Sequence, residues 1–119
     1  MQVLLVDDEK ELISTLAERL SFRGIEADWV TSGDEALGKI NEKNYDLAVL
    51  DIKMPGLSGI DLGKKIHEIN PNIKVIFVTG HGSAADYEAG TAQSGRGFYL
   101  AKPINIDLLV EKMQEALKK

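Results

Sequence analysis

The sequence predicts an α/β fold in which one parallel β-sheet is covered by helices on both faces. Short apolar runs of strand length alternate with segments of helical period, and this alternation repeats five times. Several of the apolar runs lack polar positions, which is typical of strands buried on both faces. No linker, repeat or low-complexity tract interrupts the pattern. With 119 residues, 44% of them hydrophobic and 28% charged, we expect one globular domain spanning residues 1–119.

The first part of the chain predicts two strand–helix units. Residues 2–6 read as a buried strand, and the amphipathic helix after them stops at Gly24. Residues 25–30 alternate between apolar and polar, which favours a half-exposed edge strand. Residues 31–34 supply turn and cap chemistry for a short helix that ends near Asn44. The expected inward stripes are Leu12, Ile13, Leu16, Ala17 and Leu20, then Ala36, Leu37 and Ile40.

The second part continues the alternation. Residues 46–51 form an almost unbroken apolar strand that ends in a lone carboxylate, and residues 55–56 give a Pro-Gly turn signal. The third helix ends at Asn70-Pro71. Residues 74–79 predict a fourth strand and residues 98–101 a fifth. The expected inward stripes are Leu62, Ile66 and Ile69, then Ile106, Leu109, Val110, Met113 and Leu117 in the last helix.

These elements predict a single doubly wound (βα)5 domain. Right-handed crossovers leave few topologies, and the flavodoxin-like strand order 2-1-3-4-5 places the polar second strand at an edge of a five-stranded parallel sheet. In such sheets ligands bind outside the carboxyl ends of the strands.

Composition excludes several classes of function. The net charge of −5 disfavours direct nucleic-acid binding, and the absence of cysteine excludes disulfides, thiol catalysis and zinc–thiolate sites. Two histidines make an all-protein transition-metal site improbable. No apolar run approaches the roughly 20 residues that span a bilayer, and the amino end lacks the pattern of a signal peptide. We therefore expect a cytoplasmic protein without a membrane partner.

The predicted strand ends carry the candidate chemistry. Three carboxylates, a hydroxyl and an ammonium meet at one rim: Asp7, Asp8, Asp51, Thr79 and Lys102. Clustered carboxylates repel one another unless a cation joins them, and an all-oxygen site suits Mg²⁺. A metal, a lysine and a hydroxyl around one acid can hold a transferring phosphoryl group. The adjacent acids look like a metal-holding pair, so Asp51 is the better covalent nucleophile, although spacing alone does not prove it.

Each of these residues also has an ordinary interpretation when taken alone. Asp7 and Asp8 could cap the first helix, and Asp51 could cap a helix or form a turn before Pro55. Thr79 could be a plain strand residue, and Lys102 a solvated surface lysine. Only their combination at one rim favours a functional site.

Four motifs in order at strand ends resemble the response-regulator receiver domain, and the resemblance covers essentially the whole chain. They are Val-Asp-Asp-Glu at residues 6–9, Leu-Asp-Ile-Lys-Met-Pro-Gly at 50–56, Val-Thr-Gly-His at 78–81 and Tyr-Leu-Ala-Lys-Pro at 99–103. The resemblance implies a phosphoacceptor of a two-component phosphorelay. Its phosphoryl donor would be a phosphohistidine on a sensor histidine kinase or phosphotransfer protein. Such a domain is no conventional enzyme, but it catalyses its own phosphorylation and slow autodephosphorylation.

The same resemblance implies roles for the site residues. Asp51 would take the phosphoryl group, and Asp8 and Asp51 would bind Mg²⁺ directly. Asp7 would act largely through water, and the backbone carbonyl of Lys53 would complete the protein ligands. The phosphoryl oxygens would be held by Thr79 and Lys102, and the Lys102–Pro103 bond would be cis.

The resemblance also implies how the signal leaves the site. Thr79 and Tyr99 would form the switch, the second as a rotating aromatic ring. The fourth helix, fifth strand and last helix would form the surface that an output domain or another protein target reads, or through which a homodimer forms. Lys53 and His81 flank the path of an attacking water, so we expect them to tune the lifetime of the phosphorylated state.

The segment at residues 83–94 departs from the family pattern. It lacks leucine, isoleucine and valine, and Gly90 falls in the middle of the expected fourth helix. Glycine there costs roughly 1 kcal/mol relative to alanine. We expect this helix to be short, frayed or displaced before phosphorylation.

Three other interpretations fit the sequence less well. Residues 80–85 match a Gly-x-Gly-x-x-Ala dinucleotide fingerprint, but they follow the fourth strand, and no acid ends the next one. A haloacid-dehalogenase-like phosphatase would place a second acid where Lys53 stands. A receiver-like interaction module that is never phosphorylated would not need the complete set of acids.

Overall fold

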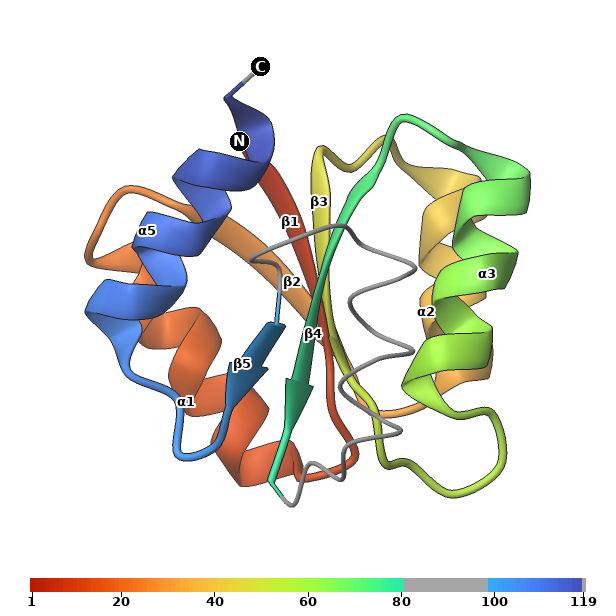
Figure 1. Ribbon diagram of the computed structural model, residues 1–119, viewed down its shortest axis with the longest axis horizontal. Coiled ribbons are helices and arrows are strands. Elements are labelled where there is room, and N and C mark those ends of the chain that lie inside the picture. The colour runs from red at the N-terminus through yellow and green to blue at the C-terminus, as the bar shows by residue number, and fades with distance from the viewer. Residues whose placement is uncertain (81–98, 119) are drawn as a thin grey trace.

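The computed structural model describes residues 1–80 and 99–118, and these form a five-stranded parallel sheet with helices on both faces (Figure 1). The strand order is β2-β1-β3-β4-β5, which confirms the predicted doubly wound, flavodoxin-like topology. The predicted fourth helix at residues 83–94 lies outside the described residues, as do His81 and Phe98.

Every neighbouring pair of strands is parallel, and β3 lies at the centre of the sheet between β1 and β4. The second strand is an edge strand, as its mixed polarity predicted, because a half-exposed position tolerates polar side chains. The strands are β1 (Gln2–Val6), β2 (Glu26–Val30), β3 (Leu47–Asp51), β4 (Lys74–Thr79) and β5 (Tyr99–Ala101).

Three of the helices in the described residues begin with a capping side chain. The side-chain oxygens of Ser32, Ser58 and Asn105 accept hydrogen bonds from the backbone N–H three residues later. The first helix is followed by Gly24 at φ +77°, a left-handed conformation that suits glycine. The helices are α1 (Lys10–Ser21), α2 (Gly33–Glu42), α3 (Gly59–Ile69) and α5 (Ile106–Leu117).

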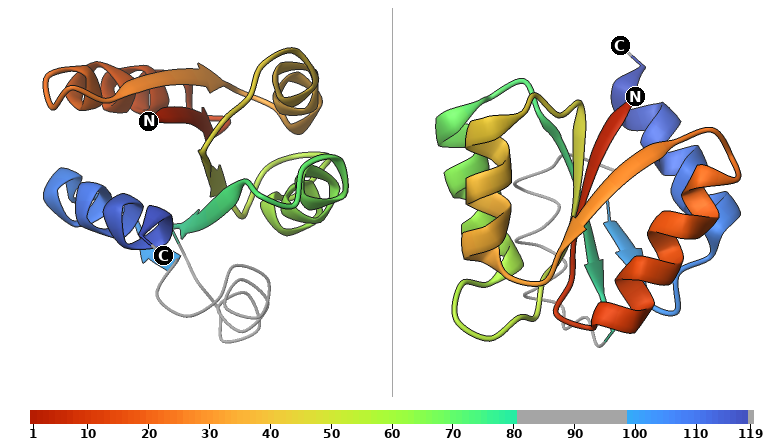
Figure 2. Two further views of the ribbon diagram at one scale, coloured as in Figure 1. Left: turned by 90° about the horizontal axis from the view of Figure 1, so that it is seen from above. Right: turned by 180° about the vertical axis from the view of Figure 1, so that it is seen from behind.

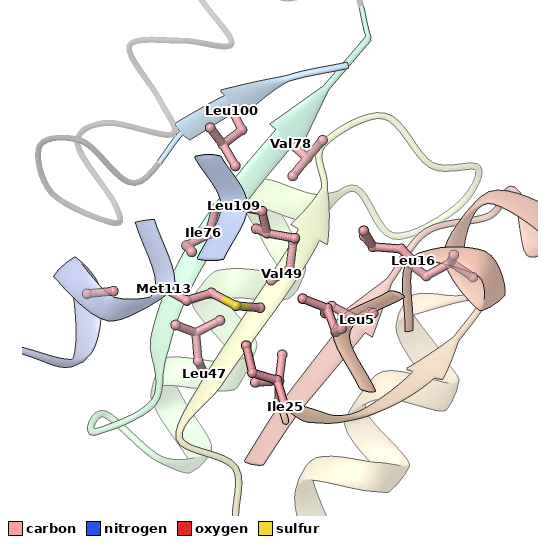
Figure 3. Close-up of a cluster of buried hydrophobic side chains, with 14 residues drawn as sticks. Leu5, Leu16, Ile25, Leu47, Val49, Ile76, Val78, Leu100, Leu109 and Met113 are labelled. Carbon is pink, nitrogen blue, oxygen red and sulfur yellow. The ribbon is translucent and has the colours of Figure 1, made fainter. Parts of the chain in front are cut away.

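Alternate strand residues face two separate cores, one on each side of the sheet. Helices α1 and α5 cover one face of the sheet, and α2 and α3 cover the other (Figure 2). Leu47 and Val49 join the core beneath α1 and α5 (Figure 3), whereas Ala48 and Leu50 join the core beneath α2 and α3. All of β3 is buried, which explains why its sequence reads as a continuous apolar run.

One predicted core residue is exposed. Ile69 was expected to face inward with Leu62 and Ile66, but 44% of its surface is accessible, whereas the other two are fully buried. Helical periodicity gives the direction of a side chain and not how far the helix extends over the core. Because Ile69 is the last residue of α3, its side chain lies at the end of the packed layer.

All five strands run toward the same rim of the sheet, and both chain termini lie at the opposite rim (Figure 1). Helix α3 therefore begins near the carboxyl end of β3 and ends near the rim of the termini. None of the described helices is long and apolar enough to cross a membrane.

Candidate functional site

The predicted site residues gather where the strands end. Asp7 and Asp8 follow β1, Asp51 ends β3, Thr79 ends β4, and Lys102 follows β5. An open pocket at this rim is lined by Asp8, Glu9, Leu12, Asp51, Lys53, Gly80, Lys102 and Pro103.

The three aspartates form one acidic group. One carboxylate oxygen each of Asp7, Asp8 and Asp51 lies within 4.8 Å of the others. Asp7 and Asp51 are buried, whereas Asp8 is exposed. Two buried carboxylates beside a third, all offering hard oxygen ligands, fit a divalent cation such as Mg²⁺. The group could therefore hold a metal ion.

The buried position of Asp51 changes its acidity. Burial, and after it the negative charge of Asp7, raises the pKa of its carboxyl group from 3.8 to about 6. The Lys102 ammonium and the backbone N–H of Lys53 oppose this rise by stabilising the carboxylate. A cation bound beside Asp51 would also lower the pKa of this carboxyl group, because it favours the charged form.

Lys102 reaches into the acidic group. Its Nζ lies 2.9 Å from Asp7 Oδ2, 3.5 Å from Asp51 Oδ2 and 2.8 Å from Glu9 Oε1. Burial lowers the pKa of Lys102, but hydrogen bonds to Glu9 and Asp7 and the charge of Asp51 more than offset this, so that its pKa is raised. The lysine is therefore a fixed positive charge at the centre of the site.

The contact with Glu9 was not predicted from the sequence. A hydrogen bond from Lys102, with the charge of that lysine, lowers the pKa of the Glu9 carboxyl group. The only signal was the place of Glu9 directly after the two aspartates. The backbone N–H of Lys102 donates to the Thr79 carbonyl at 2.8 Å, and the Lys102–Pro103 bond is cis, as the resemblance implied.

The aspartates do not serve as helix caps. The N-cap residue of α1 is Glu9, whose side chain makes no capping bond, and α3 is capped by Ser58. Asp7 Oδ1 instead accepts a hydrogen bond from the Glu9 backbone N–H at 2.9 Å. The ordinary interpretations of these acids as caps are therefore not what the structure shows.

The two predicted switch residues lie on neighbouring strands. Thr79 is buried at the end of β4, opposite Ala101 in the sheet register, while Tyr99 lies opposite Phe77. The side chain of Tyr99 packs against the core beneath α2 and α3. Thr79 thus lies on the strand next to β3, and Tyr99 lies on the edge strand beyond it.

Fold and site together define a doubly wound domain whose strand ends form an acidic pocket with a lysine in it. The model of the response regulator receiver domain family matches residues 3–114, and the chain belongs to this family. It is thus a receiver domain of the kind that two-component response regulators contain.

Curated and solved relatives agree with this assignment. The chain is 35% identical over 116 residues to the transcriptional regulatory protein GlrR of Escherichia coli, covering 98% of this chain and 26% of GlrR. A receiver domain protein (CheY-like) from Methanospirillum hungatei has a TM-score of 0.89 at 34% identity, covering 98% of this chain and 92% of that one. The response regulator TrrA from Thermotoga maritima, solved in complex with Mg²⁺-BeF, has a TM-score of 0.85 at 35% identity, covering 98% of each chain. The chain spans about a quarter of the length of GlrR.

Proposed function

We propose that Asp51 accepts a phosphoryl group from a phosphohistidine on a sensor histidine kinase or a phosphotransfer protein. The observation that carries the proposal is the surroundings of Asp51, a buried carboxylate at a strand end with two further aspartates and Lys102 around it. The Mg²⁺-BeF complex of TrrA supports it, because fluoroberyllate on a carboxylate stands in for the phosphoryl group of an acyl phosphate.

The proposed reaction is an in-line displacement at phosphorus. An Oδ of Asp51 attacks the phosphorus, the bond from phosphorus to the donor imidazole nitrogen breaks, and that nitrogen keeps the electron pair and takes up a proton. The product is a mixed carboxylic–phosphoric anhydride. No group in this scheme is oxidised or reduced.

The other site residues would stabilise the charge of the transferring group. Asp7, Asp8, Asp51 and the Lys53 carbonyl would hold Mg²⁺, which when bound neutralises negative charge on the phosphoryl oxygens. Lys102 carries the second positive charge, and it would turn from its carboxylate partners toward a phosphoryl oxygen. The Thr79 hydroxyl would donate to another.

Further parts of the proposal concern the signal and its partners. Thr79 and Tyr99 would switch the surface that includes β5 and α5, and Lys53 and His81 would tune how long the anhydride lasts. An output domain or protein target, or a second copy of the chain, would read this surface. We also propose that residues 1–119 form one receiver domain and that this domain works in the cytoplasm.

Intact-mass measurement tests the proposed function. Incubation with acetyl phosphate and Mg²⁺ should add the mass of one phosphoryl group, and Asp51→Ala should abolish the gain. Asp46→Ala is the matched control, because Asp46 lies at the other end of β3, where its carboxylate accepts a bond from the Gln2 N–H. Repeated turnover of phosphoesters would favour a phosphatase instead. A wild-type chain that gains no mass would favour an unphosphorylated interaction module.

A further inference from the structure

The first residue of α3 lies directly against the backbone of Asp51. Gly59 is buried, and a Cβ atom built on it would lie 2.2 Å from the Asp51 carbonyl oxygen. It would also lie 2.8 Å from the Asp51 carbonyl carbon and 2.8 Å from the Ile52 Cα. These are backbone atoms, which cannot rotate away as the end of a side chain can. Only glycine leaves α3 room to pack here.

The backbone that Gly59 touches is also held by hydrogen bonds on two sides. The Ile52 N–H donates to the Val78 carbonyl of β4 at 2.8 Å. The Gly59 N–H donates to the Ile52 carbonyl at 2.9 Å. The N–H and the carbonyl of Ile52, the residue after Asp51, are thus held by β4 and by the first turn of α3. Because Asp51 is joined directly to Ile52, the position of its side chain depends on both contacts.

A second glycine occupies the same place in its own helix but has different neighbours. Gly33 is the first residue of α2 and also follows a serine cap. A Cβ on Gly33 would meet side-chain atoms of Leu57, at 2.7 to 3.1 Å. A change of rotamer moves the Cγ and Cδ2 atoms of Leu57 away, and the contact with its Cβ at 3.0 Å needs a shift of only a few tenths of an ångström. Gly33→Ala therefore adds a methyl group at the start of a helix without touching the Asp51 backbone. It is the matched control for Gly59→Ala.

We propose that Gly59 is a positioning residue for phosphoryl acceptance. By letting the first turn of α3 rest on the Asp51 carbonyl, it sets where the Asp51 carboxylate and the Lys53 carbonyl lie relative to Asp7, Asp8 and Lys102. This inference rests on the proposed role of Asp51. For a methyl group at residue 59 to reach ordinary van der Waals contact, the gap of 2.2 Å must open to about 3.4 Å, a displacement of about 1.2 Å. Misplacing a reacting group by roughly 1 Å costs on the order of 100-fold in rate.

The test compares Gly59→Ala with Gly33→Ala. The phosphorylation rate with acetyl phosphate is measured by intact mass over a range of Mg²⁺ concentrations, and circular dichroism follows thermal unfolding. We expect Gly59→Ala to be slowed by about 10- to 100-fold at saturating donor and to need more Mg²⁺ for half-maximal rate. Gly33→Ala should react at the wild-type rate. Equal rates for the two variants would overturn the inference.

A second pair of variants covers the case in which Gly59→Ala does not fold. Ser58→Ala and Ser32→Ala each remove one cap bond, to the N–H of Asp61 and of Glu35, and the two bonds have the same length of 3.2 Å. Neither variant adds an atom. Slower phosphorylation in Ser58→Ala alone would support the inference, and equal rates would refute it. Phosphorylation that survives Asp51→Ala would show instead that the proposed acceptor is wrong.

Discussion

Replacing Asp51 with asparagine should stabilise the fold in the absence of Mg²⁺. The ionised carboxylate is costly where it lies, since burial and the charge of Asp7 raise its pKa from 3.8 to about 6. In the unfolded chain the group ionises at its ordinary pKa, so above pH 6 the native state carries the full cost of the buried charge. Asparagine keeps the shape of the side chain without that charge.

The size of the effect follows from the two pKa values. At about 1.36 kcal/mol per pKa unit, a rise from 3.8 to about 6 corresponds to roughly 3 kcal/mol of lost stability at neutral pH. The cost shrinks as the pH falls through 6, because the native carboxyl group takes up its proton first. Near pH 4 it should be well under 1 kcal/mol.

Urea unfolding followed by the fluorescence of Trp29 measures this difference. Trp29 is the one tryptophan of the chain and packs partly buried against the core beneath α1 and α5. The free energy of unfolding of Asp51→Asn should exceed that of the wild type at pH 7.5, and the two should converge near pH 4. Mg²⁺ should reduce this difference in the free energy of unfolding, because it stabilises the wild type, which can bind it, and not Asp51→Asn. An asparagine variant no more stable than the wild type at pH 7.5 would refute the reasoning.

Three further outcomes are expected. Phosphorylation by acetyl phosphate at low Mg²⁺ should slow as the pH falls through about 6, because the Asp51 nucleophile becomes protonated. A rate profile that is flat from about pH 5 to about pH 8 would contradict this. Mg²⁺ should raise the thermal unfolding midpoint of the wild type more than that of Asp8→Ala, as differential scanning fluorimetry can show; equal shifts would remove Asp8 from the metal site. Tyr45→Phe should lower the free energy of unfolding by about 1–3 kcal/mol in urea titrations, since the Tyr45 hydroxyl donates to Asp28 Oδ2 at 2.6 Å; an unchanged value would show that this bond contributes nothing.

The strand ends explain why much of the site could be predicted. In a parallel sheet all carboxyl ends share one rim, so a polar residue that ends an apolar run is placed by the topology alone. Asp7, Asp51, Thr79 and Lys102 each stand at such a position. The burial of β3 on both faces was likewise visible in its unbroken apolar sequence.

Three features could not be predicted, because they depend on three-dimensional distances that the spacing of residues in the sequence does not give. The contact between Glu9 and Lys102 needs the reach and rotamer of two long side chains that are 93 residues apart in the sequence. The exposure of Ile69 depends on how far α3 extends over the sheet. The role of Gly59 depends on how deeply the start of the same helix packs, because a glycine after a serine cap looks alike in α2 and α3.

The placement of both termini at the rim opposite Asp51 has a practical consequence for experiments on this chain (Figure 1). A tag, a fluorescent protein or a tether to a sensor surface joined to either end would leave the pocket open to a large phosphodonor. Immobilised chain should therefore exchange phosphoryl groups as readily as free chain. The same separation would let a phosphodonor protein reach the pocket at one rim of the sheet while a fused protein extends from the opposite rim.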